Sequence, residues 1–96
     1  NKSVNYTLVL ADTDQIICAT TSGITITVPS SVFSAGNAVT IANNTTGNIT
    51  IEQGTSATMY LSGSSTTGNR TLAQRGMSTV LCVSSNTFLI SGSGLT

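Results

Sequence analysis

Apolar and polar residues alternate in short runs along this chain, which is the pattern of β-strands with one buried face. The clearest run is Ile24–Val28, where aliphatic residues occupy one face and threonines the other. Gly23 precedes this run and Pro29 ends it. No stretch shows a sustained helical period of about 3.6 residues. The pattern therefore predicts an all-β protein.

About nine such runs follow one another at a spacing of roughly ten residues. We expect strands at residues 6–10, 15–18, 24–28, 38–42, 48–52, 57–61, 70–73, 78–83 and 87–90. Many short strands at this spacing are typical of a β-sandwich or barrel. We therefore expect a single domain over residues 1–96 with a jelly-roll-like fold of mainly antiparallel strands. The apolar-Thr-apolar unit recurs at Ile24, Val39 and Ile49, and its unequal spacings of 15 and 10 residues argue against a solenoid repeat.

Two pairs of runs carry hairpin signals. Asn43–Gly47 is rich in Asn and Gly, so we expect the flanking runs at 38–42 and 48–52 to pair with each other. The last two runs form the second expected hairpin, around Ser84–Asn86. These two runs are apolar at consecutive positions, as in strands that are buried on both faces. We expect them at the centre of the domain or against another subunit.

Charged residues make up only 6% of the chain, and its net charge is zero. Ordinary domains carry about 25%. This balance excludes electrostatic binding of nucleic acid and a polybasic membrane anchor. No apolar run approaches the ~20 residues of a membrane span, and no signal peptide is visible. Since Asn1 rather than Met begins the chain, we expect it to be processed or part of a longer protein.

The residue types that usually carry catalysis are scarce. There is no histidine, so a triad or an acid–base pair would need Asp, Glu, Lys or Cys. We interpret Asp12 and Asp14 as turn-forming or capping residues, with a cation site and then catalysis as the alternatives. Cys18 and Cys82 lack metal-ligand spacing, which leaves two buried free thiols or one disulfide. We expect no enzymatic activity, no cofactor and no metal.

Two arginines and two tyrosines have both a structural and a binding interpretation. Arg70 and Arg75 would pair with the acidic residues of the chain, or would recognise an anionic group on a partner. Tyr6 and Tyr60 would pack in the core or in an interface, or would form part of a sugar-stacking platform. The chain has only four aromatic residues and no tryptophan, which favours packing.

Four stretches of the sequence, in the same order, form a further pattern. They are YTLVLAD at Tyr6–Asp12, ITITVP at Ile24–Pro29, FSAG leading into VTI at Phe33–Ile41, and NTFLISG at Asn86–Gly92. This pattern resembles a β module of tailed-bacteriophage virion proteins, with Phe88 where an aromatic residue, often Trp, usually stands. The resemblance spans most of the chain. It implies a capsid decoration protein, a head fibre or a tail fibre component, often trimeric.

The resemblance implies a structural protein of a phage particle, most simply a small decoration or cement protein or a head-appendage component, located in the virion and assembled in the host cytoplasm. We expect homo-oligomers, with a trimer favoured, and contacts to the major capsid protein or other virion proteins, but none to nucleic acid or membrane. Symmetric self-association would also cover strand edges that few Lys or Pro residues protect.

The candidate interface residues are Val80, Cys82, Phe88, Ile90, Arg70 and Arg75. Core burial accounts equally well for the first four.

The alternative function is a receptor- or glycan-binding domain of a phage tail fibre or a bacterial adhesin. In that case the connecting loops would carry the specificity. The loops in question are residues 30–37, 43–48 and 62–69.

Overall fold

The computed structural model describes all 96 residues, as eight β-strands and one short 3-10 turn with no α-helix. The strands are β1 (Tyr6–Thr7), β2 (Ile16–Ala19), β3 (Thr25–Val28), β4 (Ala38–Asn43), β5 (Ile49–Gln53), β6 (Thr58–Leu61), β7 (Arg70–Ser84) and β8 (Thr87–Leu95). The turn η1 (Leu10–Asp12) occupies the end of the first expected strand. The expected runs at 70–73 and 78–83 are a single strand of 15 residues. The all-β prediction is confirmed.

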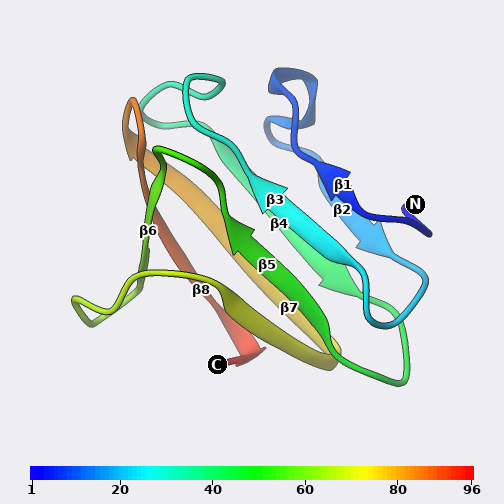
Figure 1. Cartoon of the computed structure of the whole chain (residues 1–96). Helices are drawn as coiled ribbons and strands as arrows, with labels where there is room; N and C mark the ends of the chain where they lie inside the picture. Colours follow the sequence, from blue (N-terminus) through cyan, green and yellow to red (C-terminus); the bar gives the residue numbers. More distant parts are fainter.

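Strands that are two apart in the sequence pair in parallel. β1, β3 and β5 form a first wall, and β2 pairs with β4 in a second wall that lies behind it in Figure 1. The chain passes from one wall to the other and back, which is a solenoid-like winding. Four of the seven strand pairings are parallel. The expected jelly-roll-like order of mainly antiparallel strands is therefore wrong, and so is the expected hairpin between β4 and β5, which lie in different walls.

The winding explains the unequal spacing of the apolar-Thr-apolar units. Ile26 of β3 lies opposite Ile51 of β5, 25 residues later. Ile17 of β2 lies opposite Ile41 of β4, 24 residues later. The unit that begins at Val39 belongs to the second wall, between two units that stack in the first wall. The unequal spacing does not exclude a solenoid, because neighbouring units lie on opposite walls and only alternate units stack on each other.

The long strand β7 joins the two walls. Its residues 70–72 pair with β5, and its residues 77–81 pair with β4. Between these segments the strand bends at Arg75, whose φ of +56° is rare for a residue with a side chain. β8 runs antiparallel beside β7, which confirms the C-terminal hairpin, and β6 pairs in parallel with β8. The second wall therefore has the strand order β2, β4, β7, β8, β6.

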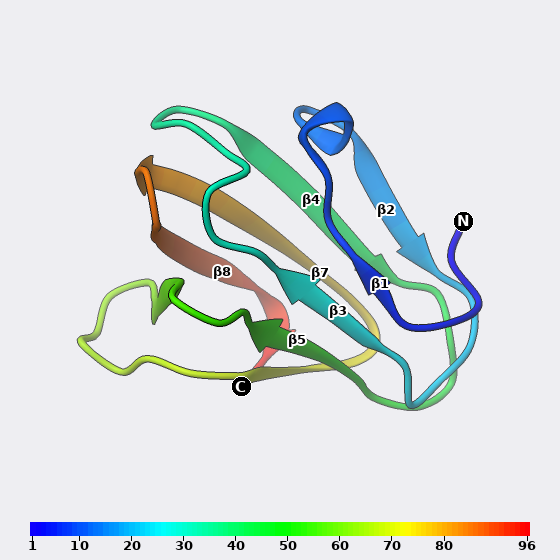
Figure 2. The same cartoon turned by 45° about the horizontal axis from the view of Figure 1, so that its top comes forward.

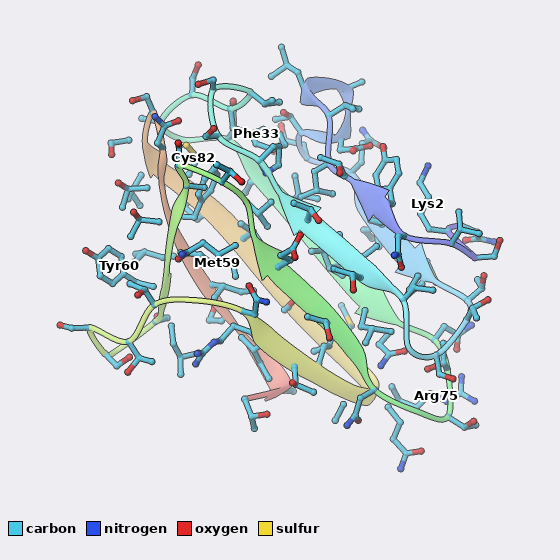
Figure 3. All side chains as sticks on the ribbon, viewed as in Figure 1. Lys2, Phe33, Met59, Tyr60, Arg75 and Cys82 are labelled. Carbon is cyan, nitrogen blue, oxygen red and sulfur yellow. The ribbon has the colours of Figure 1, made fainter.

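The inward side chains of both walls form one apolar core. Its 18 buried hydrophobic residues belong to a single cluster. Phe33, from the connection before β4, packs edge-on against Phe88 of β8, with ring centroids 6.3 Å apart. Figure 3 shows Phe33 and Cys82 at the same end of the molecule, and Met59 of β6 further along. Burial of each large aliphatic side chain contributes about 1.5–3 kcal/mol.

Asn43, the last residue of β4, is a polar group inside this core and is only 1% exposed. Its Nδ2 atom lies 2.9 Å from each of three carbonyl oxygens, those of Gly47, Leu72 and Ala73. Its Oδ1 atom accepts a hydrogen bond of 2.7 Å from the Thr45 hydroxyl. One amide group therefore holds the β4–β5 turn against β7, just before the bend that carries β7 from one wall to the other.

Removal of the Asn43 amide is expected to destabilise the fold strongly. Asn43→Ala leaves three carbonyl oxygens without this donor, and we expect the free energy of unfolding to fall by about 2–4 kcal/mol. Urea unfolding followed by circular dichroism measures the change. Asn48→Ala, at an exposed position of the same turn, is the control, and it should change stability by less than about 0.5 kcal/mol. Equal effects of the two substitutions would contradict this role of Asn43.

A second prediction concerns the close approach of β8 to β7. A Cβ atom at Gly92 would lie 2.1 Å from the Met77 carbonyl oxygen and 2.5 Å from the Ser78 Cα atom. We expect Gly92→Ala to force the strands apart and to cost more than about 2 kcal/mol. Ser91→Ala, at the neighbouring exposed position, should cost less than about 0.5 kcal/mol. Calorimetric unfolding that gave both variants the same melting temperature would refute the prediction.

Candidate interaction surface

The structure offers no enclosed site. No pocket is found on its surface. No three residues among His, Cys, Asp and Glu come together as a possible metal site. The structure contains no helix that could span a membrane. The candidate functional feature is therefore sought on the exposed faces of the two walls.

Asp12 and Asp14 are turn residues, as predicted. The Asp12 carboxylate accepts hydrogen bonds of 2.8 Å from the Val9 N–H and from the Tyr6 hydroxyl. The hydrogen bond to Asp12 raises the pKa of Tyr6, and burial adds to the rise. Lys2 Nζ lies 3.8 Å from the centroid of the Tyr6 ring. Asp14 has a φ of +63°, a left-handed conformation that Asp tolerates in turns.

The two arginines bond to asparagine residues. Arg75 donates to the Asn44 side-chain oxygen, and Arg70 Nε donates to the Asn69 carbonyl oxygen at 2.8 Å. Glu52 accepts a hydrogen bond from the Thr27 hydroxyl at 2.8 Å. Pairing of the arginines with carboxylates of the same chain is not what these contacts show, because the bend of β7 directs Arg75 to the β4–β5 turn. Pairing with a carboxylate of another subunit stays a prediction.

The tyrosines and loops that the sugar-binding interpretation requires do not lie together in the structure. Tyr6 lies in β1 and Tyr60 in β6, at different ends of the strand pairing. The connection at 30–37 is hydrogen-bonded to the end of β7 and to the β7–β8 turn, whereas the turn at 43–48 contacts the bend of β7. The loop at 62–69 follows β6 on a third side (Figure 2). The three loops therefore build no common site.

Four of the six candidate interface residues lie inside the protomer. Each of them is at most 3% exposed: Val80, Cys82, Phe88 and Ile90. Strand alternation places their neighbours Leu81, Val83 and Leu89 on the opposite side, where they are 37–41% exposed. The consecutive apolar positions of the last two strands thus cover the core on one face and meet solvent on the other. A partner could contact only the outward residues Leu81, Val83 and Leu89. Each of them is next in sequence to a candidate that turns out to be buried.

We call the outward side of β2, β4, β7, β8 and β6 the outer face of the second wall. The strand register arranges most of its residues in three rows: Ala38, Leu81, Leu89 and Tyr60; Ile16, Thr40, Thr79 and Ser91; Cys18, Ala42, Met77 and Ser93. None of these residues is charged. Lys2 and Arg75 lie on the opposite side of the view from Tyr60 (Figure 3).

The outer face is also where exposed aliphatic side chains gather. Eight large hydrophobic residues are exposed in this structure, and five of them are on this face: Ile16, Met77, Leu81, Val83 and Leu89. Met77 is 54% exposed. A large exposed apolar patch on a protein surface marks an interaction site more often than it marks ordinary surface.

Comparison of the chain with protein-family models, with curated proteins and with solved structures finds no match. The outer face of the second wall is therefore the feature from which we infer a function.

The two thiols are free and are expected to differ in reactivity. Cys82 lies in the core, where burial raises the pKa of its thiol, whereas Cys18 is half-buried on the outer face. At low protein concentration, iodoacetamide should modify Cys82 at least about tenfold more slowly than Cys18, because the thiolate is the nucleophile.

Single substitutions show which cysteine reacts at which rate. Cys18→Ser should abolish the fast alkylation in the native protein, and Cys82→Ser should leave it unchanged. Intact-mass spectrometry counts the modified thiols. Equal rates for both thiols in the native protein would contradict the described burial of Cys82.

Proposed function

We propose that this chain is a structural protein of a bacteriophage particle, acting through symmetric contacts between folded copies rather than by catalysis. The most economical form of this proposal is a small capsid decoration or cement protein or a component of a head appendage. One observation carries the structural part of it, namely the uncharged and partly apolar outer face of the second wall. The phage part is supported by the sequence resemblance described above.

The energetics of the outer face favour association. Each partly exposed aliphatic side chain that a contact buries contributes on the order of 1–2 kcal/mol. Repulsion between copies is weak, because the chain has no net charge. The partners in this proposal are further copies of the chain, preferably as a trimer, together with the major capsid protein or other virion proteins. Neither nucleic acid nor membrane is among them.

Receptor or glycan binding remains the alternative, and we do not favour it. It would depend on loops that lie on different sides of the molecule, and on two tyrosines that belong to strands far apart in the pairing order. A glycan array with hits at low protein concentration would reverse this preference.

The native mass tests the proposal directly. Light scattering coupled to size exclusion should give a multiple of the chain mass of 9.7 kDa, with a trimer at about 29 kDa. Antibodies against the chain should then label the heads or appendages of purified phage particles. A monomer at submillimolar concentration, together with unlabelled particles, would contradict the proposal.

A further inference from the structure

We propose that copies of this chain meet through the outer face of the second wall, face against face, and not by adding strands at its edges. This inference rests on the self-association in the proposed function, and it names the partner as a second copy of the chain. Because the same face of both copies makes the contact, the contact closes a two-fold pair of about 19 kDa rather than a trimer. Four features of this wall support it: its edges are partly covered, its outer face carries no charge, the side chains of the face are apolar or hydroxyl-bearing, and its area is that of a stable interface.

Both edges of the second wall are already partly covered by the chain itself. At the β2 edge, Lys2 forms a bridge with Ala19, donates its N–H to the Cys18 carbonyl at 2.8 Å and accepts from the Thr20 N–H at 2.9 Å. At the β6 edge, residue 67 forms a bridge with Tyr60. Covered edges are a common protection against edge-to-edge pairing. The face, which nothing in the protomer covers, is the open part of this wall.

The distribution of charge indicates which partner fits this face. All six charged residues lie outside its three rows. A charged surface placed against the face would lose its hydration without gaining a counter-charge, which is costly. The same face of another copy carries no charge to desolvate. A second copy of this chain is therefore the partner that the face fits best.

The side chains of the face combine an apolar row with a hydroxyl row. Leu81 and Leu89 lie directly opposite each other on β7 and β8, and the row continues to Ala38 on β4 and Tyr60 on β6. The next row contains Thr40 and Thr79, together with a serine on β8. The apolar row supplies apolar surface that a contact can bury. The hydroxyl groups of the next row can form hydrogen bonds with the other copy.

The area of the face determines what fraction of it a stable contact between two copies must bury. The wall spans five strands about 4.8 Å apart, in a molecule whose two longest extents are 33 and 28 Å. A stable interface buries roughly 800 Å² on each partner, which is about the whole of such a face. A contact through one row alone would be too small, so substitutions in different rows should each disrupt it.

Three substitutions test this surface. Thr79→Lys and Leu81→Lys place a charge in the second and first rows, and Thr50→Lys places the same charge on the outward side of β5 in the first wall. Thr79 is exposed and already polar, so its variant should fold even if the Leu81 variant does not. Circular dichroism and urea unfolding verify folding, and light scattering gives the native mass.

We expect the wild type and Thr50→Lys to share one oligomeric mass, and Thr79→Lys and Leu81→Lys to fall to 9.7 kDa. The loss of affinity should be at least about 100-fold, because a buried unpaired charge is costly. Folded Thr79→Lys with the oligomeric mass of the wild type would overturn this inference and leave the proposed function standing. A monomeric wild type would overturn this inference, and a monomeric wild type together with unlabelled particles would overturn the proposed function as well.

The reactivity of Cys18 gives an independent readout, because this residue lies in the third row of the face. Its alkylation by iodoacetamide should slow as the concentration of the wild type rises through the association range, and should stay constant for Thr79→Lys. A constant rate in a wild type that light scattering shows to be oligomeric would overturn the inference.

Discussion

The whole structure depends on the pairing of one strand, β7, with both walls. A strand that bends from one sheet into another leaves carbonyl groups without ladder partners, and an unpaired buried carbonyl group costs about 1–3 kcal/mol. Just before this bend the Asn43 amide donates to the Leu72 and Ala73 carbonyl oxygens. This donor therefore supports the segment of β7 at which the strand leaves the first wall for the second. The buried amide thus adds a specific polar contact to the apolar core that the two walls share.

Asn43 is one case of a wider use of amide side chains. The Asn5 side chain accepts from the Thr25 N–H, the Asn86 side chain from the Ser31 N–H, and the Gln53 side chain from two further backbone groups. In each case an amide oxygen satisfies a backbone donor where the strand ladder is interrupted. Neutral amides suit this task because they bond to the backbone without the desolvation cost of a charge.

Sequence reasoning located most strands because each one leaves a local period-2 signal, as at Ile24–Val28. It could not determine their partners. The turn at Asn43–Asn48 looks like that of a hairpin, but the Asn43 amide bonds to β7 and the turn leads into the other wall. Only the Ser84–Asn86 turn joins strands that pair with each other. The sequence also left open whether Val80, Cys82, Phe88 and Ile90 lie in the core, where the structure has them, because consecutive apolar positions do not reveal which alternate set faces inward.

The pairing order also has a consequence for synthesis. β7 and β8 are the only paired strands that are neighbours in the sequence, and they are the last of the eight strands to be synthesised. Every other pairing must close a longer loop, which slows folding. Until this hairpin is made, the walls that β1 to β5 form lack the strand that joins them, and part of their apolar sides stays in contact with solvent. A chain of this design is exposed to aggregation during its own translation, and the time needed to synthesise β7 and β8 sets how long that exposure lasts.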